Sequence, residues 1–173
     1  GQYMLSPVKL AVMHLKYMIS KTAGRVSKRL FMEFSDIDKI IENEFKMSIQ
    51  SIFEKKGETF FRKLEEKITI QESKKKNTVI SLGGGAFMSA KIRKAILSSS
   101  KTFWLDLGLT LIKKRLISSK KRPLLNNKNL SKILEKIYNE RKNTYATSNY
   151  RIKCDKLSVN LITYKIIKLY ANN

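Results

Sequence analysis

Three consecutive glycines are the clearest sign of a ligand site in this chain. Gly83, Gly84 and Gly85 directly follow residues 78–82, a β-branched and apolar run that predicts a buried strand. Three glycines in a row cost conformational entropy and add no side chain to a core. Their backbone can approach a ligand closely and present N–H donors to an anion at the start of a helix. The run therefore predicts contact with an anionic ligand.

A pair of carboxylates precedes a predicted helix. Asp36 and Asp38 follow the short stretch 32–34, and the apolar residues after them recur at helical spacing. Such carboxylates can hold a cation or accept a proton from a substrate. They can equally cap the helix, because a helix N-terminus favours negative charge. Taken from the residues alone, both interpretations stay open.

Three arginines have the chemistry to bind anions, because a guanidinium fork matches carboxylate and phosphate groups. Arg122 precedes Pro123 in a polar segment, and Arg141 lies near the end of a predicted helix. Arg62 lies on another predicted helix, with glutamates four residues before it and three and four residues after it. For Arg62 an ion pair on the helix surface is therefore the simpler explanation.

Strand-like and helix-like stretches alternate along the chain and would position these residues. The predicted strands are 8–15, 78–82, 102–107 and 150–154; the predicted helices are 21–31, 36–45, 57–71, 89–97, a helix ending at Leu116, 129–145 and a C-terminal helix over 159–169. Strands separated by helices of about 10–15 residues indicate βαβ units and a parallel sheet. Residues 118–129 are polar and break the periodicity, so they predict a mobile loop. We expect one three-layer α/β/α domain over residues 1–173.

Composition narrows the class of protein further. The 173 residues are 42% hydrophobic and 29% charged, with 36 Lys+Arg against 14 Asp+Glu and a net charge of +22. So basic a surface attracts polyanions, but lysine spread over every helix is the simpler reading, and no nucleic-acid-binding motif is present. The single cysteine, Cys154, excludes a disulfide framework and fits a reducing compartment. Cys154 and the single histidine, His14, are both expected to be structural. No apolar run approaches the roughly 20 residues of a membrane span.

An ordered series of motifs resembles the shikimate kinase family. The series comprises D-x-D at 36–38, S-I-x-x-I-F at 48–53, G-E-x-x-F-R-x-x-E at 57–65, G-G-G at 83–85, R-P-L-L at 122–125 and R-x-x-x-Y at 141–145. Any one motif is weak, but the ordered set is specific and covers residues 32–170. The resemblance implies an NMP-kinase-like fold with a five-stranded parallel sheet in the order 2-3-1-4-5. It also implies transfer of the γ-phosphoryl group of ATP to the 3-hydroxyl of shikimate with Mg²⁺, in the aromatic amino-acid (chorismate) pathway of the cytoplasm.

The resemblance also assigns roles to residues and partners. It places shikimate against Asp38, Arg62, Gly83, Gly84, Gly85 and Arg141, with the two arginines on the shikimate carboxylate and Asp38 taking the proton of the nucleophile. It places the nucleotide against Lys21, Thr22, Arg115 and Arg122, with Arg122 catalytic on a lid at about 118–129, and Mg²⁺ against Asp36 and Thr22. Shikimate and ATP are the expected partners of a monomer, with no specific nucleic acid and no membrane.

The N-terminal segment 1–24 departs from the family pattern. The family needs a phosphate-binding loop, G-x-x-x-x-G-K-[ST], after its first strand, but no glycine lies between Gly1 and Gly24. The nearest match is Ser20-Lys21-Thr22, in which Ser20 replaces one glycine and Leu15 stands where the other belongs. The chain could therefore be a kinase with an altered nucleotide loop, a shikimate-binding protein without turnover, or a family member with a damaged N-terminus. A basic N-terminal targeting segment and a basic nucleic-acid-binding domain are the remaining alternatives.

Overall fold

Five parallel strands form the central sheet of the computed structural model, which describes residues 2–6, 12–117 and 127–172. Their order across the sheet is β2-β3-β1-β4-β5. The strands are β1 (Gln2–Ser6), β2 (Glu33–Asp36), β3 (Thr78–Ser81), β4 (Ser100–Asp106) and β5 (Tyr150–Lys153). Because every neighbouring pair is parallel, the carboxyl ends of all five strands lie at one edge of the sheet.

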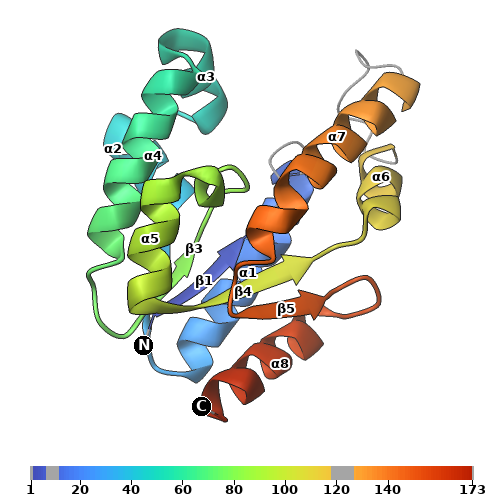
Figure 1. Ribbon diagram of the computed structural model, residues 1–173. Helices are drawn as coiled ribbons and strands as arrows, with labels where there is room; N and C mark the ends of the chain where they lie inside the picture. Colours follow the sequence, from blue (N-terminus) through green and yellow to red (C-terminus); the bar gives the residue numbers. More distant parts are fainter. Residues whose placement is uncertain (1, 7–11, 118–126, 173) are drawn as a thin grey trace.

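Helices connect successive strands, which gives the expected β/α alternation (Figure 1). They are α1 (Val12–Arg29), α2 (Ile37–Phe45), α3 (Ile49–Lys56), α4 (Glu58–Glu72), α5 (Ala90–Ser99), α6 (Leu109–Ile117), α7 (Asn127–Tyr145) and α8 (Val159–Ala171), with a short 3₁₀ turn, η1 (Ala86–Met88), after β3. Side-chain caps begin several of them, for example Ser89, whose hydroxyl accepts from the Ile92 N–H at 3.3 Å. The α/β architecture predicted from the sequence is confirmed.

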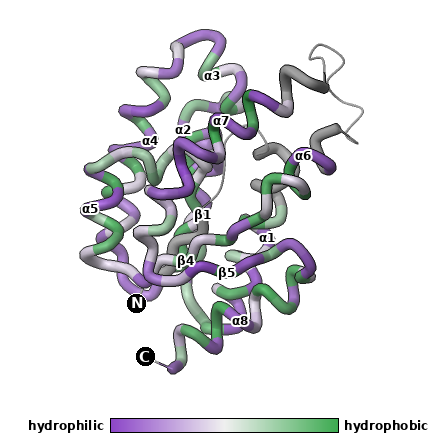
Figure 2. Tube along the Cα trace, turned by 45° about the vertical axis from the view of Figure 1, so that its right-hand side comes forward, coloured by the Kyte–Doolittle hydropathy of each residue, from purple (hydrophilic) through white to green (hydrophobic). Residues whose placement is uncertain are grey.

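Apolar side chains fill both faces of the sheet. Val79 and Phe103 point to the face covered by α1 and α8, where Ile19 and Ile166 pack on them. Successive strand residues point to opposite faces, so neighbouring positions such as Trp104 serve the other face, which α4 and α5 cover. The helices are amphipathic and carry both hydrophobic and hydrophilic residues along their length (Figure 2).

Two predictions about element bounds were wrong. Residues 8–15 were expected to form a strand, but the first strand is β1, and Val12 already begins α1. The apolar side chains Ile19, Ala23 and Val26 are buried at helical spacing, so this run belongs to a helix face rather than to a strand. Helix α7 begins at Asn127, which shortens the expected loop of 118–129; residues 118–126 lie outside the described part of the chain. None of the helices described here is long and apolar enough to span a membrane.

Candidate functional site

The carboxyl ends of β2 and β3 bring the predicted carboxylates beside the glycine run. The two strands pair in register, with Asp36 opposite Ser81, so the residues that follow each strand meet at one edge. Asp38 is buried in the first turn of α2. A methyl group on Gly83 would lie 3.2 Å from Oδ1 of Asp38 and 3.2 Å from Oε1 of Glu65. Two carboxylates from different helices therefore face the backbone of Gly83.

Asp36 caps helix α2, which was the simpler of its two interpretations. Its Oδ1 accepts the Lys39 N–H at 3.2 Å, with Asp36 itself in extended backbone conformation. Its Oδ2 accepts the hydroxyl of Ser20 at 2.7 Å. The contact from α1 to the end of β2 thus comes from Ser20 and not from Thr22. One carboxylate oxygen serves the cap, and the other accepts a hydrogen bond from α1.

Arg62 lies against the last glycine of the run. A Cβ atom on Gly85 would lie 2.6 Å from Cζ of Arg62, far inside van der Waals contact, so only glycine fits without moving the guanidinium group. Nη1 of Arg62 donates to Oε2 of Glu65, and Nε lies 3.5 Å from Glu58. The helix-surface ion pair expected for Arg62 is therefore present. It also directs the guanidinium group toward the glycine run.

Helix α7 contacts the same glycine run from another side. Nη1 of Arg141 donates to the carbonyl of Gly84 at 3.1 Å. The buried Tyr145, four residues later on α7, donates its hydroxyl to the same carbonyl. The structure thus brings together six predicted residues: Asp38, Arg62, Gly83, Gly84, Gly85 and Arg141. Sequence reasoning missed the contacts of Glu65 and Tyr145, although both lie inside quoted motifs.

The predicted nucleotide residues of α1 are not placed at a helix start. Lys21 is exposed and lies nine residues after the first residue of α1, Val12. Thr22 is buried, and its hydroxyl donates at 2.7 Å to the carbonyl of Met18 one turn earlier. The Thr22 hydroxyl thus donates within the helix and not to Asp36, and the assignment of Thr22 to a metal ion stays a prediction. Arg122 lies outside the described residues, as does the side chain of Arg115.

A second polar cluster lies at the carboxyl ends of β4 and β5. Arg151 donates to Oδ2 of the buried Asp106 from Nε at 2.8 Å and from Nη2 at 2.5 Å, and the Tyr138 hydroxyl donates to Oδ1 at 3.4 Å. Burial, followed by the Asp106 charge, raises the pKa of Tyr138, and the hydrogen bond to Asp106 raises the pKa of Arg151. Burial also raises the pKa of the Cys154 thiol to about 12. The cluster joins β4, β5 and α7, and Cys154 beside it is a buried core residue whose N–H donates to the Asp106 carbonyl at 2.8 Å.

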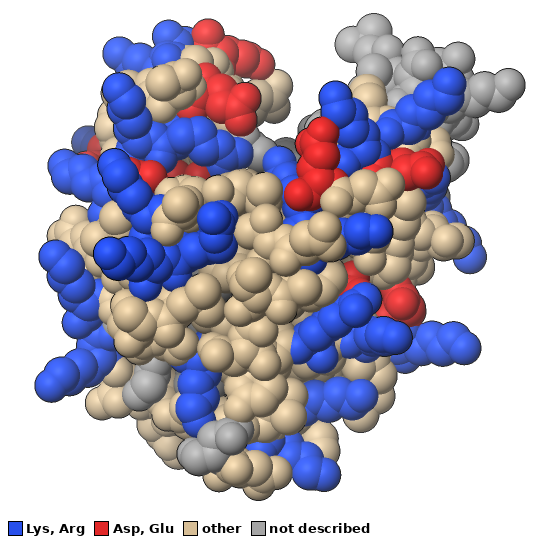
Figure 3. Space-filling view, viewed as in Figure 1, with Lys and Arg blue, Asp and Glu red and all other residues tan. Residues whose placement is uncertain are grey.

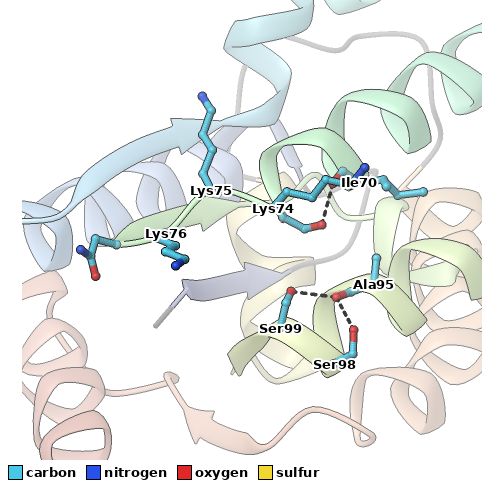
Figure 4. A pocket seen from close by; sticks show the side chains of 9 residues that line it. Ile70, Lys74, Lys75, Lys76, Ala95, Ser98 and Ser99 are labelled. Carbon is cyan, nitrogen blue, oxygen red and sulfur yellow. Dashed lines mark hydrogen bonds between the residues drawn. The ribbon is translucent and has the colours of Figure 1, made fainter.

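Two other surface features are a cavity and the distribution of basic side chains. A cavity of about 580 Å³ is lined by Ile70, Ser73, residues 74–77, Ala95, Ser98 and Ser99, after the carboxyl ends of α4 and α5 (Figure 4). Its serine hydroxyls donate to helix carbonyls, namely Ser73 to Ile70 and Ser98 and Ser99 to Ala95. The face seen in Figure 3 carries lysine and arginine over most of its extent rather than in one band. None of the residues that line the cavity is a predicted site residue.

The fold of this chain matches that of kinases of known structure. A shikimate kinase from Bacteroides thetaiotaomicron superposes with a TM-score of 0.83 at 21% identity, over 98% of each chain. A shikimate kinase from Acinetobacter baumannii, solved in complex with shikimate, gives 0.83 at 28% identity, over 99% of this chain and 93% of that one. The chain therefore has the α/β kinase fold of these proteins, with the site at the edge where the strands end.

Sequence comparison then identifies the family. The family model described as shikimate kinase matches residues 20–171. The shikimate kinase of Bacillus subtilis is 42% identical over 137 residues, which cover 77% of this chain and 72% of that protein. That of a Sulfurihydrogenibium species is 35% identical over 84% of this chain and 87% of its own. The chain belongs to the shikimate kinase family.

Proposed function

We propose that this chain is a shikimate kinase that transfers the γ-phosphoryl group of ATP to the 3-hydroxyl of shikimate in aromatic amino-acid biosynthesis. Besides the family membership, one observation carries the proposal: Arg62 from α4 and Arg141 from α7 meet at the Gly84–Gly85 peptide. Two guanidinium forks at one place suit a carboxylate ligand. We further propose that residues 1–173 form one NMP-kinase-like domain on the β2-β3-β1-β4-β5 sheet, acting as a cytoplasmic monomer.

Asp38 is the proposed acceptor of the substrate proton. It is buried beside Gly83 at the edge where the strands end, and the Glu65 carboxylate faces the same side of that glycine. A shikimate held by its carboxylate at the arginines would turn its hydroxyls toward Asp38. Phosphoryl transfer needs positioning and charge stabilisation more than covalent catalysis. The N–H groups of the glycine run and Arg122 are the proposed donors to the transferring phosphoryl group.

A magnesium ion fits the residues at the end of β2. Mg²⁺ prefers oxygen ligands and is commonly held by one or two carboxylates together with substrate phosphates and water. Asp36 ends β2, and one of its carboxylate oxygens accepts the hydroxyl of Ser20, which lies within α1. We therefore propose Asp36 and Ser20 as the protein groups that hold Mg²⁺, which when bound neutralises phosphate charge. Arg115 and Lys21 remain predicted contacts of the nucleotide.

A second candidate is a shikimate-binding protein with little turnover. It is favoured by the position of Lys21 and Thr22 within α1, because a phosphate-binding loop presents such residues where a helix begins. The proposed shikimate contacts lie close together in the described residues, which supports both candidates, so the two candidates differ in the proposed nucleotide half. A thermal-shift titration separates the halves. A ligand present at a hundred times its dissociation constant stabilises the folded state by about 2.7 kcal/mol.

The deciding experiment is a coupled assay of ADP release with shikimate and Mg·ATP. Shikimate-dependent ADP release supports the kinase. A thermal shift with shikimate but neither turnover nor a shift with Mg·ATP supports the binding protein. Inorganic triphosphate is the control for the +22 net charge, and the salt concentration should be about 0.15 M, where exposed charges are screened beyond about 8 Å. The absence of any response to shikimate contradicts both candidates.

A further inference from the structure

Tyr145 joins the glycine run to the helix that carries Arg141, and the proposed function gives it no task. Its side chain is among the most completely buried in the described chain. Its hydroxyl and Nη1 of Arg141 donate to the same acceptor, the carbonyl of Gly84. The two donors lie one turn apart on α7, so a single carbonyl oxygen attaches the glycine run to this helix at two points.

Aromatic neighbours fix the ring of Tyr145. Its centroid lies 6.4 Å from that of Phe87, with the planes 20° apart, and 5.8 Å from that of Trp104, with the planes 45° apart. Phe87 belongs to η1 directly after the glycines, and Trp104 belongs to β4. Because the ring packs on two other aromatic rings and is fully buried, the hydroxyl has a defined place. Its removal in a Tyr145→Phe variant leaves the ring packing intact.

The hydrogen bonds at Gly84 determine how the next peptide group faces. A peptide group is planar and trans, so its carbonyl and its N–H point in opposite directions, and no cis peptide occurs among the described residues. With the Gly84 carbonyl held toward α7, the N–H of Gly85 points away from α7. The guanidinium group of Arg62 lies against Cα of the same Gly85. One peptide plane therefore sets the relative places of Arg62 and Arg141.

We propose that Tyr145 is a positioning residue for shikimate, which acts by fixing the orientation of the Gly84–Gly85 peptide. The inference rests on the proposed function, because it assigns the two arginines to the substrate carboxylate. Tyr145 itself does not touch the substrate. Its hydroxyl keeps the peptide in the orientation in which Arg62 and Arg141 face one ligand group together.

The test compares Tyr145→Phe with Tyr138→Phe. Both tyrosines lie on α7 and both donate a hydroxyl hydrogen bond, but Tyr138 donates to Asp106 and not to the glycine run. In the coupled assay we expect Tyr145→Phe to raise the KM for shikimate about tenfold, the factor that corresponds to about 1.4 kcal/mol, with the KM for ATP unchanged. We expect Tyr138→Phe to leave the KM for shikimate at its wild-type value. Urea unfolding checks that both variants are folded in the assay.

A second measurement does not depend on catalysis. In ¹H–¹⁵N spectra of the ligand-free protein, Tyr145→Phe should move the amide resonance of Gly85, and Tyr138→Phe should not. Wild-type protein that fails to phosphorylate shikimate contradicts the proposed function, whatever the spectra show. Wild-type turnover with an unchanged shikimate KM in Tyr145→Phe overturns the positioning role and leaves Tyr145 as packing. An unmoved Gly85 resonance, or an equal rise in KM for both variants, overturns it as well.

Discussion

Replacing Gly85 by alanine should separate shikimate binding from folding. The new Cβ atom would lie 2.6 Å from Cζ of Arg62, whereas carbon atoms rest at about 3.5–4.0 Å from each other. The guanidinium group must therefore retreat by about 1 Å, and misplacement of a positioning group by this distance can cost about a hundredfold in rate. A hydrogen bond to a charged group contributes about 1.5–3 kcal/mol. At about 1.36 kcal/mol for each factor of ten, we expect shikimate binding to weaken roughly 10- to 150-fold.

Stability should change little in the same variant. The clashing atoms are the far end of a flexible arginine side chain, and Gly85 has ordinary backbone angles, with φ at −95°. An alanine there restricts the unfolded chain, which stabilises by about 0.4–1 kcal/mol and offsets part of the cost of moving Arg62.

Isothermal titration with shikimate and urea unfolding measure the two effects. Gly24→Ala is the matched control, because a Cβ atom there would meet only Phe34, at 3.6 Å. It should stabilise α1 by up to about 1 kcal/mol without changing shikimate affinity. Wild-type affinity in Gly85→Ala would refute the placement of Arg62 on the substrate.

Three further outcomes are expected. Arg141→Ala should weaken shikimate binding by about 1.5–3 kcal/mol in a titration; unchanged affinity would remove Arg141 from the site. Since burial raises the pKa of Cys154 to about 12, a thiol reagent at pH 8 should label it only after urea unfolding, and rapid labelling of native protein would contradict its burial. The Ser89 hydrogen bond lowers the pKa of Glu66, so this carboxylate stabilises the fold at neutral pH and loses that contribution as acid protonates it. Urea midpoints should therefore fall more steeply with acid in wild type than in Glu66→Gln, and parallel curves would exclude the effect.

The sequence predicted an element best where its buried residues form a clear pattern. Helix α2 was found because its apolar residues recur at helical spacing on one buried face, and strand β4 was found because it is a continuous apolar run buried on both faces. The N-terminal run failed for a physical reason: its apolar residues are dense enough to suit either a strand or a helix. The run forms a helix because its apolar pattern continues at helical spacing through Ala23 and Val26, which pack in the same core as α8.

The site was predictable to the extent that it follows from topology. The carboxyl ends of parallel strands meet, so Asp38 and the glycine run had to lie close together. The long-range contacts were not predictable. No local pattern shows that Tyr145 reaches the Gly84 carbonyl 61 positions away, or that Ser20 rather than Thr22 reaches Asp36. Such contacts depend on how the helices pack against the sheet, and local sequence patterns do not predict this packing.

The central place of β1 has a consequence for how this chain can change. Strands β3 and β4 do not pair with each other; each pairs with β1, through Leu5 opposite Ser81 and Leu5 opposite Phe103. The five-residue strand β1 therefore joins the two halves of the sheet. Its pairing partners lie about 75–100 positions away along the chain, so we expect these non-local contacts to form late in folding. Deleting β1 would divide the sheet into two parts that do not pair with each other, so the whole fold depends on this strand.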